Sequence, residues 1–323
     1  MQSQLFKRVS AIAICLWLPL VSLSATASPA DRYPESMLYS KPVKVAEGVW
    51  SAIGATQYFS YENGGHNNNL SFVEGQDAVL VVNGGSAYLL AKALHDEIKQ
   101  ITDKPVLYVV NENGQSHAAL GNGYWQEQGA KIIAHEDAIT EIEHKGADGL
   151  EEMSNILKEQ IAGTELVTVD RSFSDQLEID LGGLKVQLVR FGPAHSPGDI
   201  SVLVPERNVL IAGDMAFHQR MLPVFPDTDT AAWLETWHNS FEPVARKMVI
   251  VPGHGEPTDF TEVDKYTRGY LEYMRSKVAE LLDNDGALED AYQIDQTPYK
   301  HLETYEQLAG KNAGRIFEAM EFE

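Results

Sequence analysis

Gly192-Pro-Ala-His195-Ser-Pro-Gly-Asp199 is the stretch that decides the fold, together with three shorter polar segments. These are Asn111-Glu-Asn-Gly-Gln-Ser-His117, Ala212-Gly-Asp214-Met215 and Pro252-Gly-His254-Gly-Glu256. Each segment lies at the end of a predicted strand. Strand ends on one edge of a layered α/β fold converge, so we expect these side chains to lie close together. Imidazole and carboxylate groups are ligands that zinc prefers, and the sequence therefore points to a metal-type site at this edge.

Apolar runs and helical periodicities alternate along both halves of the chain. A fully apolar run such as 78–82 is typical of a strand covered on both faces. Strands are predicted at 43–50, 70–73, 78–82, 105–110, 131–134, 167–169, 177–181, 185–190, 200–204, 209–212 and 248–251, and helices at 86–101 (capped by Ser86), 118–128, 136–161 and 259–282. Strands clustered in each half, with helices between them, predict an α/β protein with two sheets and helices outside.

The four polar segments resemble the metal-binding loops of the metallo-β-lactamase superfamily. The loops of His195, Asp214 and His254 match the family motifs position for position. The resemblance implies an αββα sandwich, two mixed β-sheets packed face to face with helices on both outer faces. On this basis residues 28–42 are a lead-in, 43–282 the metallo-β-lactamase-like domain, and 283–323 a C-terminal helical extension packed on it.

The first loop departs from the family pattern His-x-His-x-Asp-His. Asn111 and the segment 119–122 keep the family frame without a gap. In that register Asn113 and Gln115 replace two histidines, His117 replaces the aspartate, and Ala118 replaces the last histidine. A shift of one residue would place His117 on the final histidine but would lose the Asn111 match, so we prefer the ungapped register. Asn83 also replaces an aspartate that is usual after the first buried strand.

The altered loop changes the metal sites that the resemblance implies. Amides are poor zinc ligands, so the first site, reduced to Asn113, Gln115 and His195, is expected to be empty. The second site retains His117, Asp214 and His254, with His195 near enough to complete a tetrahedron or to hold a water. We therefore expect one zinc ion, weakly bound or absent.

A single ion would activate water and polarise a carbonyl or phosphoryl oxygen. Asp214 is the expected group that orients the water, and Glu112 is a candidate base. Asn113, Gln115, His218 and His66 are candidate pocket residues. The implied function is hydrolysis of a small ester, thioester, lactone or amide. The alternative function is a non-catalytic ligand-binding protein that keeps the sandwich and its pocket but has lost the two-metal centre. Structural interpretations of single residues also stay open: Asn113-Gly114 as a turn, His117 as a capping or core histidine, and His218 and His66 as surface residues.

The N-terminus has the order of a secretory signal peptide. Lys7 and Arg8 precede an apolar stretch at 9–23, and Ala25-Thr-Ala27 supplies small residues for cleavage. We predict a signal peptide at 1–27 and export, to the periplasm; a retained membrane anchor is the alternative. Cys15 is the only cysteine and lies in this segment, so the remaining 296 residues form no disulfide and offer no thiolate ligand.

The exported chain is strongly acidic. Loss of Lys7 and Arg8 leaves 23 basic and 47 acidic side chains, a formal charge of −24. Such a surface repels phosphate backbones, so nucleic acid is not an expected partner. The expected partner is a small-molecule substrate, with no membrane contact after cleavage of the signal peptide. The sequence carries no signal for an oligomeric state.

Overall fold

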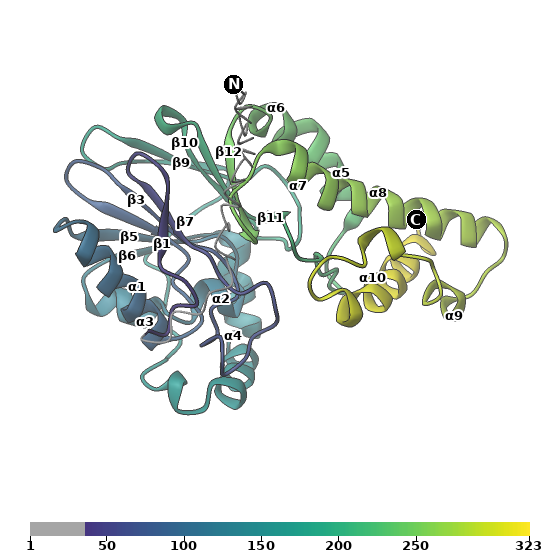
Figure 1. The fold of residues 1–323 in the computed structure, drawn as a ribbon, viewed down its shortest axis with the longest axis horizontal. Coiled ribbons are helices and arrows are strands. Elements are labelled where there is room, and N and C mark those ends of the chain that lie inside the picture. Colours follow the sequence, from purple (N-terminus) through teal and green to yellow (C-terminus); the bar gives the residue numbers. More distant parts are fainter. Residues whose placement is uncertain (1–35) are drawn as a thin grey trace, which may run out of the picture.

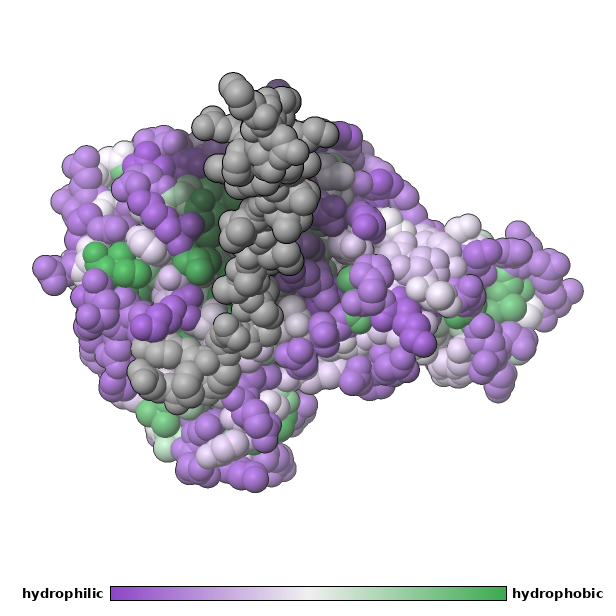
Figure 2. Space-filling model, viewed as in Figure 1, coloured by the Kyte–Doolittle hydropathy of each residue, from purple (hydrophilic) through white to green (hydrophobic). Residues whose placement is uncertain are grey.

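The computed structural model describes residues 36–323, so the predicted signal peptide lies outside the described residues. Two β-sheets pack face to face, and helices cover the outer face of each sheet (Figure 1). The predicted αββα sandwich is therefore confirmed. Among residues 36–323, no helix has both the length and the apolar character needed to cross a membrane. On the face that Figure 2 shows, the surface is largely hydrophilic with small separate hydrophobic patches.

The first sheet is built from the N-terminal half and keeps the order of the sequence. Its strands are β1 (Pro42–Ala46), β2 (Val49–Ala52), β3 (Leu70–Glu74), β4 (Val79–Val82), β5 (Val106–Asn111), β6 (Lys131–His135) and β7 (Arg171–Phe173). The first four strands pair antiparallel, and β4 to β7 pair parallel. Its helices are α1 (Tyr88–Ile101), α2 (Ser116–Ala119), α3 (Asn122–Glu127), α4 (Glu136–Leu157) and the 3-10 turn η1 (Lys158–Ile161).

The second sheet has the order β12-β11-β10-β9-β8, in which only β11 and β12 pair parallel. Its strands are β8 (Gln176–Asp180), β9 (Lys185–Val189), β10 (Ser201–Val204), β11 (Val209–Phe217) and β12 (Val249–His254). The remaining elements are η2 (Pro205–Arg207), α5 (Thr230–Thr236), η3 (Trp237–Phe241), α6 (Glu242–Ala245), α7 (Phe260–Tyr266), α8 (Arg268–Asp283), α9 (Leu288–Ala291), η4 (Thr297–Tyr299) and α10 (Tyr305–Met320).

Three apolar clusters hold these layers together. Valine, leucine and isoleucine side chains of both sheets, such as Leu80 and Val202, fill the space between the sheets. A second cluster joins the first sheet to α1, α3 and α4. The third joins the second sheet to α5, α7, α8 and α10, and includes Trp233 and Phe317. The last helices, α8 to α10, extend to one side of the sandwich in Figure 1.

Strand β11 runs five residues further than predicted and carries Asp214 inside the strand. Its pairing with β12 shifts register on both sides of Gly213. Gly213 has φ +61°, and a Cβ there would lie 2.0 Å from Oε2 of Glu112. Glycine is therefore required at this position, because it lets β11 bend while the Glu112 carboxylate approaches the backbone.

Two helix boundaries differ from the prediction. The helix expected at 259–282 is interrupted at Thr267, whose hydroxyl accepts a hydrogen bond from the Phe217 amide at 2.9 Å. Ser86 does not cap α1; it donates to the carbonyl of Gly65 at 2.7 Å, and the cap position is Ala87. In both cases a contact distant in sequence decides the local geometry. The helical connector predicted at 136–161 is α4 followed by η1.

Trp233 is expected to be a major determinant of stability. Its side chain is fully buried, and its ring lies 5.9 Å from His195 and 6.3 Å from Phe217. We expect Trp233→Ala to lower the free energy of unfolding by about 3–5 kcal/mol, because the substitution leaves a cavity beneath the site. Phe322→Ala, at a side chain that is 87% exposed, is the control and is expected to change it by less than about 0.5 kcal/mol. Equal effects in urea denaturation would contradict this assignment.

Candidate metal centre and cavity

Five titratable side chains meet where three strands end. Glu112 follows β5, His117 lies on α2, Asp214 is in β11, His254 ends β12, and His195 is in the loop between β9 and β10. None of the five is more than 4% exposed. The edge predicted from the sequence therefore does gather these residues.

Asp214 is the centre of this cluster. Its Oδ2 lies 3.6 Å from Nε2 of His117 and 3.7 Å from Nδ1 of His195, and its Oδ1 lies 3.4 Å from Nε2 of His254. Nε2 of His117 is also 3.1 Å from Oε1 of Glu112. Ligand atoms about 2.1 Å from a tetrahedral zinc ion lie about 3.4 Å apart, so these spacings are those of a metal site.

Burial shapes the protonation of the cluster. It raises the pKa of Glu112 to about 8 and, with the neighbouring Glu112 charge, the pKa of Asp214 to about 7. It lowers the pKa of His195 to about 3, and lowers those of His117 and His254. The imidazoles are therefore neutral at pH 7, which is the form that binds metal.

His254 faces Asp214 through Nε2. Its Nδ1 lies 2.5 Å from the carbonyl oxygen of Asn67 and 3.1 Å from the donor Nη1 of Arg220; the shorter contact, to an acceptor, favours the ring proton on Nδ1 and a lone pair on Nε2. Nε2 then faces Oδ1 of Asp214, which has no hydrogen-bond partner among residues 36–323. Two acceptors at this distance need a proton or a cation between them. A divalent cation fits the set Glu112, His117, Asp214 and His254, of which the first three have ligand atoms within 4.8 Å of one another.

The other metal position of the family does not fit an ion. Asn113 donates through Nδ2 to Oδ1 of Asp199 at 3.2 Å and to Oδ2 of Asp214 at 3.3 Å. Gln115 donates through Nε2 to Nδ1 of His195 at 3.1 Å. Both amides thus point N–H groups, not lone pairs, at the groups that would share a metal.

A second layer of hydrogen bonds orients the cluster. Asn83, at a position where the resemblance implies an aspartate, accepts the backbone N–H of Glu112 at 3.0 Å. Asp199 accepts from the backbone and hydroxyl of Ser196 as well as from Asn113, and burial holds its pKa well above the ordinary value. These contacts fix the altered loop against the second sheet, in the way that outer-shell partners fix metal ligands.

A cavity of about 520 Å³ opens onto the cluster. His117, His195, Asp214, His254 and Gln115 line it, with walls from α4, the loops at 56–69 and 217–229, and α10. Phe217, Phe225 and Trp233 surround His195 at ring distances of 5.0–5.9 Å. The cluster is therefore reached from an open-mouthed and partly apolar cavity.

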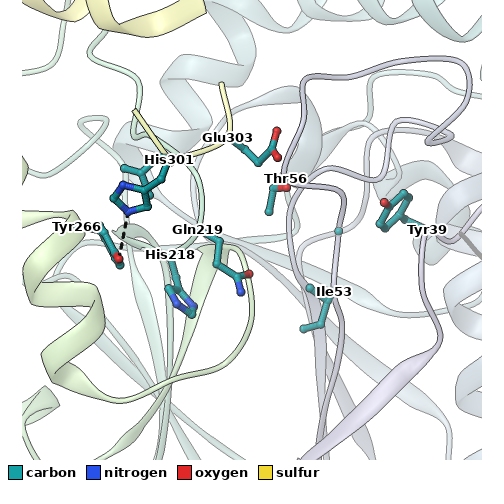
Figure 3. A pocket seen from close by; sticks show the side chains of 10 residues that line it. Tyr39, Ile53, Thr56, His218, Gln219, Tyr266, His301 and Glu303 are labelled. Atoms are coloured by element: carbon teal, nitrogen blue, oxygen red, sulfur yellow. Dashed lines mark hydrogen bonds between the residues drawn. The ribbon is translucent and has the colours of Figure 1, made fainter. Parts of the chain in front are cut away.

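The structure places neither His66 nor His218 on this cavity. His66 is fully buried, accepts the Tyr39 amide at Nδ1 (2.8 Å), and has Nε2 3.2 Å from the Ala52 carbonyl. His218 lies in a separate cavity of about 320 Å³, beside Tyr266 and His301 (Figure 3). The first histidine holds the loop at 56–69 in place. The second donates its backbone amide to the His254 carbonyl at 3.1 Å, but its side chain does not line the cavity of the cluster.

Arg220 is a residue of the site that sequence reasoning missed. It is 4% exposed, and its guanidinium lies 5.3 Å over the ring of Tyr58. Its Nη1 is 3.1 Å from Nδ1 of His254, on the side of the ring away from Asp214. Burial lowers the pKa of Arg220 to about 10. The loop at 217–229 has no sequence pattern that would have indicated this position.

The layers and the cluster define the class: a hydrolase-like αββα sandwich with metal-type ligands at the edge where strands of the two sheets end. Residues 63–254, more than half of the chain, match the Metallo-beta-lactamase superfamily, and the chain belongs to that superfamily. The resemblance inferred from the four loops is confirmed.

Individual relatives are distant. The chain is 22% identical over 239 residues to a type 2 metallo-beta-lactamase from Bacteroides fragilis, covering 69% of this chain and 86% of the relative. A metallo-beta-lactamase from Pontibacter korlensis superposes with TM-score 0.59 and 17% identity, over 72% of this chain and 98% of its own. The sec-alkylsulfatase Pisa1 from Pseudomonas sp. gives TM-score 0.68 and 14% identity over 87% of this chain, which spans half of the sulfatase.

Zinc loading is expected to depend on pH. Ligation requires Glu112 and Asp214 without protons, whereas burial raises their pKa values to about 8 and about 7. Apparent zinc affinity should therefore fall as the pH is lowered from 8.5 to 6, by about 10-fold per pH unit for each proton displaced. The histidines have lowered pKa values and are already neutral above pH 6.5, so they add no pH dependence to zinc binding in that range. Calorimetry in buffers of different ionisation enthalpy measures the protons released; release of none at pH 7 would contradict the assignment.

Proposed function

We propose that this chain is an exported hydrolase that uses one divalent metal ion, zinc by preference, against a small ester, thioester, lactone or amide. The ion would be held by Glu112, His117, Asp214 and His254. One observation carries the proposal: neutral imidazoles and two carboxylates meet in a buried cluster, with Nε2 of His254 facing an unpartnered Oδ1 of Asp214. Membership of the superfamily and the matching loop positions support it.

Bound metal supplies Lewis acidity, which activates water near pH 7 and polarises the bond to be hydrolysed. The Asp214 carboxylate lies 3.4–3.7 Å from a ring nitrogen of His117, His195 and His254, so it would share an ion with the nearest imidazoles. Glu112, proposed from the sequence as a base, lies instead among the ligand atoms. It therefore adds negative charge that favours a cation.

His195 has a different role from that of a ligand. Its Nδ1 accepts from Gln115, so the ring proton is on Nε2, which has no partner among residues 36–323. The strongly lowered pKa of His195 makes it a poor base at pH 7. We assign it the task of donating a hydrogen bond to a substrate oxygen in the cavity that it lines.

Export and the small-molecule partner also belong to this proposal. The signal-peptide pattern at 1–27 supports release into the periplasm. A cavity of about 520 Å³ suits a small substrate, and the acidic chain does not suit nucleic acid.

Metal analysis and a substrate panel test the proposal. Protein purified without added metal and then zinc-loaded is assayed with chromogenic esters, thioesters, lactones and β-lactams, with and without chelator. We expect one zinc per chain and chelator-sensitive turnover that Glu112→Gln abolishes. His218→Gln, in the separate cavity, is the control and should keep both properties. A ligand-induced thermal shift with neither metal nor turnover would replace the hydrolase with a non-catalytic binding protein.

A further inference from the structure

We propose that the substrate carries an anionic group, a carboxylate, sulfate or phosphate, which binds Lys311 and Arg315 on α10 while the group to be hydrolysed lies at the Asp214 cluster. This inference rests on the proposed function and names its substrate class. It concerns a wall of the cavity outside the residues that match the superfamily, which end at 254.

The cationic wall comes from one face of α10. Leu308, Lys311 and Arg315 are spaced by three and four residues, which places them in one row on a helix. All three line the cavity that opens onto the metal cluster. An apolar side chain and two cations thus face the same space from a single rigid element.

These cations lack carboxylate partners. No Asp or Glu oxygen among residues 36–323 lies within 4.0 Å of a charged nitrogen of Lys311, Arg315 or Arg220. By contrast, Lys145 on the opposite wall is paired with Asp227 at 2.5 Å and with Glu141 at 3.4 Å. Lys311 is exposed and Arg315 half-buried, and in a chain with 47 acidic and 25 basic side chains this pair of cations without carboxylate partners would attract an anionic ligand.

The charges on the other cavity walls determine at which end an anionic group would bind. Tyr58 lies under the guanidinium of Arg220, and the charges of both Arg220 and Arg315 act on its hydroxyl. The α4 side instead carries acidic residues such as Asp148 and Glu152. An anion is therefore repelled from α4 and attracted to α10.

The cationic wall is held in place before any ligand binds. Arg315 donates through Nη1 to the Val224 carbonyl, and its guanidinium lies 5.9 Å over Phe225. Asn312 accepts the Val224 amide at 2.9 Å and donates to the Leu222 carbonyl at 2.8 Å. These bonds fix α10 to the loop at 217–229, so binding requires little reorganisation.

The body of the ligand is expected to be apolar. The walls of the cavity also include hydrophobic side chains, among them Phe59, Leu120, Ile142, Leu166, Phe225 and Leu308. Short-chain acids with a hydrolysable bond at the far end match this combination of one charged end and an apolar stem.

Binding of matched neutral and anionic probes tests the inference without catalysis. Calorimetry on zinc-loaded protein compares octanoate with octanamide, which differ in charge but not in shape. We expect octanoate to bind about 10-fold more tightly, with the difference shrinking in 0.5 M salt. The double variant K311Q/R315Q should remove the preference, whereas Lys99→Gln, an exposed lysine of α1, should keep it. Equal binding of the two probes would overturn the proposal.

Octyl sulfate and octyl phosphate, used at concentrations below micelle formation, identify which anionic group fits best. Turnover then separates this inference from the hydrolase proposal. Mono-p-nitrophenyl glutarate should show a KM about 10-fold below that of p-nitrophenyl butyrate, and K311Q/R315Q should make the two KM values equal. Hydrolysis of both esters with equal KM would refute the anionic subsite alone. Octanoate preference without any hydrolysis would support the subsite and refute the hydrolase.

Discussion

Replacing Asp214 with asparagine is expected to lower zinc affinity by more than about 100-fold, because the substitution removes a ligand oxygen and also the negative charge at the centre of three imidazoles. The amide matches the carboxylate in shape, so the fold should survive. Competition with a chromophoric chelator at pH 8 measures the affinity.

Two further measurements, one on a control variant and one on metal-free protein, are needed to interpret the zinc affinity of D214N. His218→Asn, in the separate cavity, should bind zinc as the parent does. The free energy of unfolding of the metal-free D214N variant should be equal to or higher than that of the metal-free parent at pH 8, since it no longer buries a charge that burial disfavours. Parent-like zinc affinity in D214N would show that the ion lies elsewhere.

The double substitution N113H/Q115H is expected to raise the zinc content from one ion per chain to two. Asn113 Nδ2 lies 3.3 Å from Asp214, and Gln115 Nε2 lies 3.1 Å from His195. Imidazoles at these positions would convert two N–H groups into lone pairs beside His195, whose Nε2 has no partner among the described residues. Mass spectrometry of metal content, after dialysis against limiting zinc, gives the stoichiometry.

The matched control is N113Q/Q115N, which keeps amides at both positions and should bind one ion. A single ion in N113H/Q115H, with unchanged affinity, would mean that the altered loop is not what emptied the first site. The number of zinc ions in N113H/Q115H, one or two, also tests the sequence register, since the prediction assumes that Asn113 and Gln115 occupy the histidine positions of the family.

Much of the architecture could be predicted because local pattern and burial agree. The run at 78–82 became the buried strand β4, and the polar segments after β5, within β11 and at the end of β12 meet at one edge. The bend at Gly213 and the break at Thr267 could not be predicted, because each depends on a contact with a distant residue. Sequence patterns report periodicity and not such contacts.

Part of the site could be predicted, again because the sequence carries local motifs but not contacts with distant residues. His117, His195, Asp214 and His254 were identified by motif position, and the structure brings them together. The direction of the Glu112 carboxylate was not readable, because a residue that directly follows a strand can face either side of the sheet. His66 was a candidate pocket residue from its Gly- and Asn-rich surroundings, yet its ring binds backbone atoms of Tyr39 and Ala52.

The central claim is that a single ion is held by Glu112, His117, Asp214 and His254. Anomalous diffraction at the zinc edge, from crystals grown with excess zinc, tests it most directly. The account predicts one strong peak about 2.0–2.2 Å from a side-chain atom of each of these residues. A peak between Asn113, Gln115 and His195, or none within the cavity, would contradict it.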